Sequence, residues 1–183
     1  MTQTKLNALN EFVRRLVPEP GKHSPMEYLE IASKQVKPGQ KRDLNDAGFV
    51  EKFTGIVTSF MKKEAYGKPT DPRNITTFPA KVKLDYAAFM YLLMDHMKTF
   101  DFYAFGKTPF DVAQRVAQLC VGAQRVSCPD ISRMDGFVNH FARTIERAVG
   151  LRFFAPEHAA EFTKTHEESF GNTGITSDGT LLS

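Results

Sequence analysis

Residues 130–136 read Asp-Ile-Ser-Arg-Met-Asp-Gly and lie between two segments of different character. Residues 124–128 precede them and end at Pro129, a pattern that predicts a short β-strand. Residues 136–149 follow, with an aromatic or aliphatic residue at every fourth position, which predicts a helix. A strand that leads through two aspartates into a helix predicts that both kinds of element are present, so the expected fold class is α+β.

Most other apolar residues recur every three or four positions, as in amphipathic helices. This spacing predicts helices at residues 5–16, 46–61, 82–98 and 157–169. Thr108 followed by Pro109 predicts the start of another, because Thr is a favoured helix cap and Pro suits the first turn. Residues 34–42 are expected to form a basic loop, since they contain Pro38 and Gly39. The chain is therefore predicted to be mostly helical.

Composition excludes several classes of protein. The 183 residues suffice for a domain with a sizeable core, and no apolar stretch is long enough to cross a bilayer. Nothing resembles an export signal, so Cys120 and Cys128 are expected to be reduced rather than paired. The net charge is only +3, so any binding of nucleic acid must depend on local clusters of cations.

The two aspartates, Asp130 and Asp135, could hold a divalent cation. Carboxylate oxygens suit Mg²⁺, which usually shares its ligands with substrate phosphates. Two-metal phosphoryl transfer needs such carboxylates from more than one segment. The alternative is structural: Asp130 starts a turn and Asp135 caps the next helix, and spacing alone favours this interpretation.

A second cluster consists of cations in a proline-containing loop. It contains Lys62, Lys63, Lys68 and Arg73. Arg presents a planar fork to phosphate and Lys a point charge, so such a loop could hold a triphosphate or an RNA backbone. Taken alone, the pattern favours a solvated charged loop over a phosphate-binding site.

Residues 58–183 resemble the polymerases of positive-strand RNA viruses, in particular those of nodaviruses and related invertebrate viruses. Phe60-Met61-Lys62-Lys63-Glu64, followed by residues 71–75, is similar to the basic fingertip segment called motif F. The resemblance implies that Lys62, Lys68 and Arg73 contact the incoming nucleoside triphosphate. It also implies that Glu64 orders the loop by pairing with a basic residue.

Residues 130–136 resemble motif A of the same family, and residues 103–109 resemble the link between these motifs. By this resemblance Asp130 binds the catalytic metal, Mg²⁺ or Mn²⁺, and Asp135 belongs to the ribose-recognition network. Residues 171–183 resemble the approach to motif B, with Ser183 at the position of that motif's serine. The Gly-Asp-Asp metal motif, motif C, does not occur in the sequence.

The resemblance implies a truncated right-hand polymerase. It would contain mostly helical fingers and the first strand and helix of the palm. Residues 1–129 would be fingers, with the fingertip loop at 58–78, and residues 130–183 would start the palm. The implied partners are an RNA template, the nascent strand and nucleoside triphosphates. The implied location is a replication complex at a membrane in the host cytoplasm.

Two alternatives remain beside a partial polymerase. The chain could be an obligate subunit of a split polymerase, in which a second polypeptide supplies motif C. It could also be a non-catalytic helical RNA-binding module, for which the small net charge is unfavourable. Whether it is a partial polymerase or a subunit of a split polymerase, the chain alone is expected to be inactive, because half of a two-metal site cannot hold both metals.

Overall fold

The computed structural model describes residues 2–47, 53–130 and 138–182. In chain order its elements are α1 (Gln3–Leu16), α2 (Tyr28–Lys34), α3 (Pro38–Asp46), β1 (Ile56–Met61), β2 (Asn74–Thr77), α4 (Ala80–Met97), α5 (Pro109–Cys120), α6 (His140–Phe153), the 3₁₀ turn η3 (Pro156–His158), α7 (Ala159–Glu167), β3 (Thr173–Ile175) and β4 (Leu181–Leu182). The predicted α+β class is confirmed. Within the described part of the chain, no helix is both long and apolar enough to cross a membrane.

The chain forms two compact units, each assembled from two separate segments. The first unit combines residues 1–24 with 91–156, and the second combines residues 25–90 with 157–183. Helix α4 contributes its first part to the second unit and its end to the first. The predicted division into residues 1–129 and 130–183 follows motifs rather than packing, and it stays a prediction.

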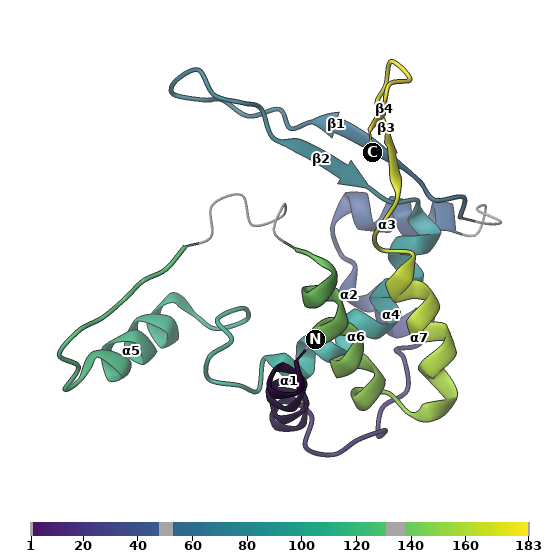
Figure 1. Ribbon diagram of the computed structural model, residues 1–183. Coiled ribbons are helices and arrows are strands. Elements are labelled where there is room, and N and C mark those ends of the chain that lie inside the picture. The colour runs from purple at the N-terminus through teal and green to yellow at the C-terminus, as the bar shows by residue number, and fades with distance from the viewer. Residues whose placement is uncertain (1, 48–52, 131–137, 183) are drawn as a thin grey trace. The chain divides into compact units, whose positions relative to one another are not determined.

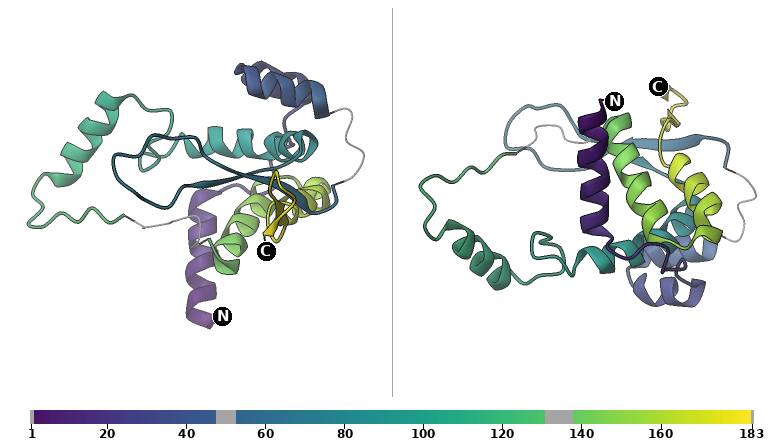
Figure 2. Two further views of the ribbon diagram at one scale, coloured as in Figure 1. Left: turned by 90° about the horizontal axis from the view of Figure 1, so that it is seen from above. Right: turned by 60° about the horizontal axis from the view of Figure 1, so that its bottom comes forward.

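The first unit is organised around α1 and α6, which lie side by side (Figure 2). Helix α1 buries Leu9, Val13 and Leu16, and α6 buries Val149 and Phe153. These residues recur at three- and four-residue spacing, which places them on one face of each helix. Burial of these apolar side chains is the main stabilising contribution to the unit.

The segment after α1 is fixed to the end of α6 by polar contacts. The guanidinium of Arg152 donates from Nε to the carbonyl oxygen of Val17 over 2.6 Å and from Nη2 to that of Pro18 over 3.1 Å. The amide of Gly21 donates to the carbonyl oxygen of Arg152 over 2.8 Å. Gly21 has φ +67°, a left-handed conformation that glycine adopts without strain.

The second unit contains a four-stranded sheet in the order β2-β1-β3-β4 (Figure 1). Strand β1 pairs antiparallel with β2 and parallel with β3, and β4 pairs antiparallel with β3. In the register of these pairs, Val57 lies opposite Gly174, which lies opposite Leu182. The sheet therefore joins two segments that are far apart in the sequence.

An aromatic cluster forms the core of the helical part of this unit. Phe89 of α4 is fully buried and meets Phe162 of α7 edge to face, with ring centroids 5.4 Å apart. His166 is also buried, 5.8 Å from the ring of Phe162 and 5.5 Å from that of Phe170. These contacts connect the same two chain segments that the sheet connects.

The structure corrects three of the predicted elements. The helix predicted at residues 46–61 is wrong, because residues 56–61 form β1. The basic loop predicted at residues 34–42 is wrong, because α3 begins at Pro38. The strand predicted at residues 124–128 is also wrong: these residues are exposed and have no strand assignment.

The remaining helix predictions agree with the structure. The helices expected at residues 5–16, 82–98 and 157–169 correspond to α1, α4 and α7. Helix α5 starts after Thr108 as predicted, and α6 corresponds to the helix predicted at residues 136–149, although it runs from His140 to Phe153.

Candidate functional site

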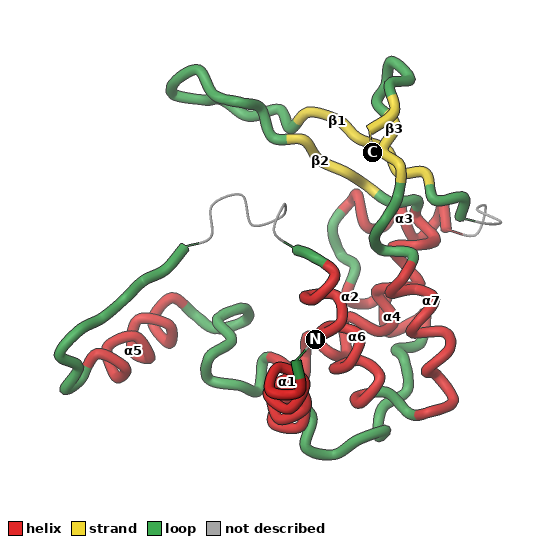
Figure 3. The backbone as a smooth tube through the Cα atoms, in the orientation of Figure 1, coloured by secondary structure: helices red, strands yellow, loops and turns green. Residues whose placement is uncertain are grey.

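Two cations of the predicted fingertip loop, Lys62 and Arg73, lie where the strands of a β-hairpin meet its loop. Strands β1 and β2 pair with Thr58 opposite Thr77 and Met61 opposite Asn74. The amide of Lys62 then donates to the carbonyl oxygen of Arg73 over 2.8 Å, which extends the pairing beyond both strands. The chain between these residues forms a long loop (Figure 3). Cross-strand pairing therefore brings Lys62 and Arg73 together although they are eleven positions apart.

Glu64 lies between the two cations. Its Oε1 forms an ion pair with Nζ of Lys62, and its Oε2 lies 3.3 Å from Nε of Arg73. The hydrogen bond from Lys62 is the main reason that the pKa of Glu64 lies below its ordinary value, and the charge of Arg73 lowers it further. The side chain of Glu64 is 24% exposed, whereas those of Lys62 and Arg73 are 41% and 67% exposed. Both cations thus keep surface available to a ligand.

Tyr66 completes this network. Its hydroxyl donates to Oε2 of Glu64 over 3.2 Å and accepts from the backbone amide of Arg73 over 3.2 Å. One hydroxyl thereby links the carboxylate to the strand that carries the second cation. Nothing in the sequence singles out Tyr66, because a tyrosine among charged residues does not indicate which backbone amide it will meet.

The two other lysines of the loop are arranged differently. Lys63 and Lys68 are exposed, and neither forms an ion pair with another described residue. The structure therefore brings Lys62 and Arg73 together at Glu64, and it leaves Lys68 without a described contact to that group.

A small polar cluster supports the hairpin from within the sheet. The hydroxyl of Ser59 is hydrogen-bonded to that of Thr76 over 3.0 Å and accepts from Nδ2 of Asn74 over 3.2 Å. Ser59 is 2% exposed, and these bonds satisfy its hydroxyl. They also fix Asn74, the residue after Arg73, and so hold the start of β2 against β1.

The predicted approach to motif B belongs to the same sheet. Strand β3 leads into a turn in which Asp178 accepts from the hydroxyl of Thr176 and from the amide of Thr180. Strand β4 then returns along β3. A side chain at Gly174 would place its Cβ 3.3 Å from Leu182, so glycine permits the close pairing. Ser183 itself lies outside the described residues, but the residue before it pairs within this sheet.

The predicted metal-binding segment is only partly described. Asp130 is exposed and lies in the first unit, in a stretch without helix or strand. Asp135 falls within residues 131–137, outside the described part. Among the residues that the structure describes, no group of three or more His, Cys, Asp or Glu side chains could hold a metal ion. The roles of both aspartates stay predictions.

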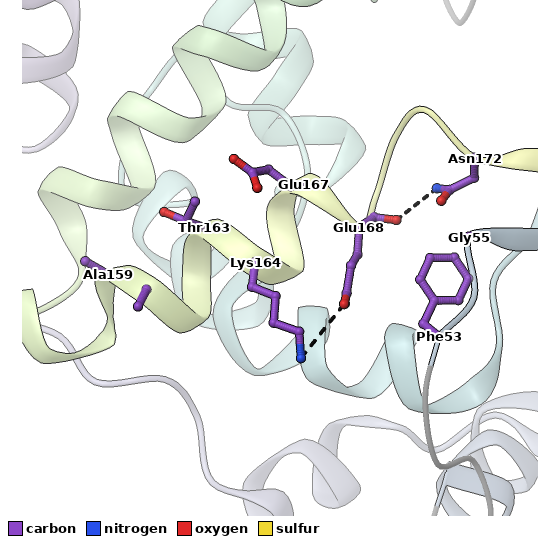
Figure 4. Close-up of a pocket in the computed structure, with 9 residues that line it drawn as sticks. Phe53, Gly55, Ala159, Thr163, Lys164, Glu167, Glu168 and Asn172 are labelled. Atoms are coloured by element: carbon purple, nitrogen blue, oxygen red, sulfur yellow. Dashed lines mark hydrogen bonds and ion pairs between the residues drawn. The ribbon is translucent and has the colours of Figure 1, made fainter.

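An open pocket of about 760 Å³ lies elsewhere in the second unit (Figure 4). Phe53 and Gly55 line one side and α7 lines the other. Lys164 on α7 pairs with Glu168 over 3.9 Å, and Asn172 donates to the carbonyl oxygen of Glu168 over 2.9 Å. The lysine that lines this pocket is thus already paired, and none of the predicted site residues lines the pocket.

Comparison with known proteins identifies the family. The chain is 33% identical over 157 residues to the RNA-directed RNA polymerase of Atlantic halibut nervous necrosis virus, covering 84% of the chain and 16% of that protein. It is 32% identical over 156 residues to the polymerase of striped jack nervous necrosis virus, with the same coverage. It is 30% identical over 174 residues to that of Pariacoto virus, covering 93% of the chain and 18% of the relative. No family model and no solved structure matches.

These matches define the class of protein: the chain corresponds to part of a viral RNA-directed RNA polymerase. The chain belongs to the nodavirus members of that family and corresponds to part of one, since it spans 16 to 18% of the length of these relatives. The resemblance drawn from the motifs is thereby confirmed.

Proposed function

We propose that this chain is the nucleotide-entry part of a polymerase that joins nucleotides to the 3′-hydroxyl of an RNA strand, directed by an RNA template. In this reaction the hydroxyl attacks the α-phosphate of a nucleoside triphosphate, and pyrophosphate leaves. The observation that carries the proposal is the pair of cations, Lys62 and Arg73, which flank the hairpin loop just beyond β1 and just before β2 and are held at one carboxylate, that of Glu64. The names of the relatives support the same reaction.

The two cations would neutralise the triphosphate. The exposed guanidinium of Arg73 can present two N–H groups to phosphate oxygens, and Lys62 adds a point charge. Lys68, farther along the loop, would meet a more distant phosphate or the template backbone. Because there is little covalent chemistry for a protein to do in such a transfer, these residues would act by positioning and by stabilising charge.

Asp130 fits one ligand position for Mg²⁺ or Mn²⁺, because its carboxylate is exposed and offers the hard oxygen atoms that such ions prefer. The bound ion would neutralise charge on the reacting phosphates. One carboxylate supplies too few ligands to hold two ions, so we propose that a Gly-Asp-Asp segment, absent from these 183 residues, comes from the rest of the polymerase or from a second polypeptide. Asp135 would read the ribose hydroxyl, and Ser183, at the position of the serine of motif B, would contribute to nucleotide binding.

The test is direct titration of the purified chain with Mg²⁺ and ATP, followed by ¹H–¹⁵N NMR. Signals of the β1–β2 hairpin should shift on binding. Arg73→Gln should weaken binding about tenfold, since a charged hydrogen bond is worth roughly 1.5–3 kcal/mol and 1.4 kcal/mol is tenfold. Lys62→Gln should act in the same direction.

The matched control is Arg42→Gln, which removes an exposed cation from α3 of the same unit. It should leave ATP affinity unchanged. Equal weakening by the Arg42 and Arg73 variants would mean that the chain attracts ATP only through overall charge. Hairpin signals that do not respond to ATP would also overturn the proposal.

The need for a further segment has its own test. Nucleotide incorporation by the purified chain on a primed RNA template should be undetectable. Incorporation that Asp130→Ala abolishes would show that the chain carries a complete metal site. Salt-dependent RNA binding that is indifferent to Mg²⁺ and to the Arg73 and Asp130 variants would instead favour a non-catalytic RNA-binding module.

A further inference from the structure

The hydroxyl of Tyr66 connects the beginning of the β1–β2 hairpin loop to its end. On one side it donates to Oε2 of Glu64, and on the other it accepts from the backbone amide of Arg73. Both bonds are 3.2 Å long. The residues on either side, Ala65 and Gly67, offer no polar side chain that could replace it.

The direct contact between Glu64 and Arg73 is weak by comparison. It joins Nε of Arg73 to the carboxylate over 3.3 Å, and the guanidinium is 67% exposed. An exposed pair of this kind contributes little and does not hold a long side chain in one orientation. Tyr66 adds a constraint that brings no charge of its own, because its neutral hydroxyl bonds to the backbone amide of Arg73 and to the same carboxylate oxygen.

We propose that Tyr66 is a positioning residue of the nucleotide-binding loop, which holds Glu64 so that Lys62 and Arg73 face one polyphosphate together. This inference rests on the function proposed above for the two cations. Tyr66 need not touch the nucleotide. A loop ordered beforehand binds more tightly, since less conformational entropy is lost when the ligand arrives.

The positioning role of Tyr66 can be distinguished experimentally from electrostatic attraction between the loop and a phosphate. Tyr66→Phe removes the hydroxyl but no charge, so the attraction between the loop and a phosphate is unchanged at long range. Arg73→Gln removes a charge. The two variants should therefore differ in how salt affects ATP binding, because salt screens charge and does not screen order.

The experiment compares Tyr66→Phe with the wild-type chain in ATP titrations at several salt concentrations. Affinity should fall about threefold to tenfold, because the two hydrogen bonds that order the loop are lost. Its dependence on salt should stay that of the wild-type chain. The amide of Arg73 should exchange faster with solvent, which reports the lost bond directly. The control is Tyr28→Phe, on an exposed tyrosine of α2 in the same unit.

The outcomes separate this inference from the proposed function. Weakening by Arg73→Gln without weakening by Tyr66→Phe would overturn the role of Tyr66 and leave the function standing. A lower melting temperature of the Tyr66 variant with unchanged ATP affinity would likewise show a merely structural role. If neither variant weakens binding, the function proposed for the two cations fails first.

Discussion

His23 lies flat against Phe153 in the first unit, with ring centroids 4.1 Å apart. The carbonyl oxygen of His23 accepts from the amide of Ala155 over 2.8 Å, so the backbone is fixed beside the ring. Burial is the main cause that lowers the pKa of His23 below its ordinary value of 6.5, and the positive charges of His96 and Lys22 lower it further. The folded chain thus favours the neutral ring.

A lowered histidine pKa makes stability depend on pH. Between the lowered pKa and 6.5, the unfolded chain binds a proton that the folded chain does not, so stability rises with pH in that window. We expect the melting temperature to fall as the pH is lowered from 7.5 to 5.5. His23→Gln should flatten this dependence, and His140→Gln, at an exposed position, should not. The same slope in all three proteins would show that His23 does not titrate within this window.

At the level of single residues, part of the hairpin site is predictable from the sequence. Glu64 was expected to pair with a basic residue, and the structure shows it between Lys62 and Arg73. Tyr66 was not expected, because its partner is a backbone amide seven positions away. Charge complementarity can be read from a sequence, whereas the position of a neutral hydroxyl depends on how the loop folds back.

Strand β1 shows why an element can be assigned to the wrong class. Ile56, Val57 and Phe60 recur at the spacing of a helical face, which predicts a helix. In the structure Val57 and Ser59 are buried while Ile56 and Phe60 are exposed, which is the alternation of a strand. Pairing with β2 and β3 decides between the two, and the residues of β3 lie near the other end of the chain.

Helix α5 shows the opposite case, in which local signals suffice. Thr108 accepts from the amide of Asp111 through its hydroxyl, and Asp111 accepts from the amide of Thr108, which forms a capping box. None of the residues of α5 is buried. With little tertiary packing to stabilise it, the helix depends on its cap and on its intrinsic propensity more than α1 or α6, which bury several apolar residues.

Thr108→Ala should therefore destabilise α5 locally. Loss of a cap costs about 1 kcal/mol, which corresponds to about a fivefold loss of amide protection in the helix. Hydrogen exchange should show this loss across α5 and leave α6 unchanged. Thr108→Ser keeps the hydroxyl and serves as the matched control. Equal loss in both variants would mean that the methyl group, rather than the cap, stabilises the helix.

The division of the whole molecule into two units could not be predicted from local pattern. The second unit combines residues 25–90 with 157–183, and the residues between them belong to the first unit. The contacts that join its segments include the parallel pairing of β1 with β3 and the packing of Phe89 on Phe162. A long-range parallel pair leaves no periodic mark in a sequence, so motif order is a guide to function here and not to packing.

Phe89 is the residue whose loss should separate these two segments. Its ring is fully buried against Phe162, and Phe→Ala in a core costs about 3–5 kcal/mol. Since native proteins are stable by only about 5–15 kcal/mol, Phe89→Ala should lower the urea midpoint sharply. Strands β1 and β3 lie in the two chain segments that the packing of Phe89 on Phe162 holds together. We therefore expect the amides of both strands to lose protection from hydrogen exchange together.

The control for this change is Phe110→Ala, at a ring that is 74% exposed on α5 in the first unit. It should change stability by no more than about 0.5 kcal/mol, as surface substitutions do. If Phe89→Ala unprotected β3 while β1 and the hairpin kept their protection, the sheet would not be one cooperative element. The cation pair at Glu64 would then be held by the hairpin alone, and ATP binding should survive the loss of the core.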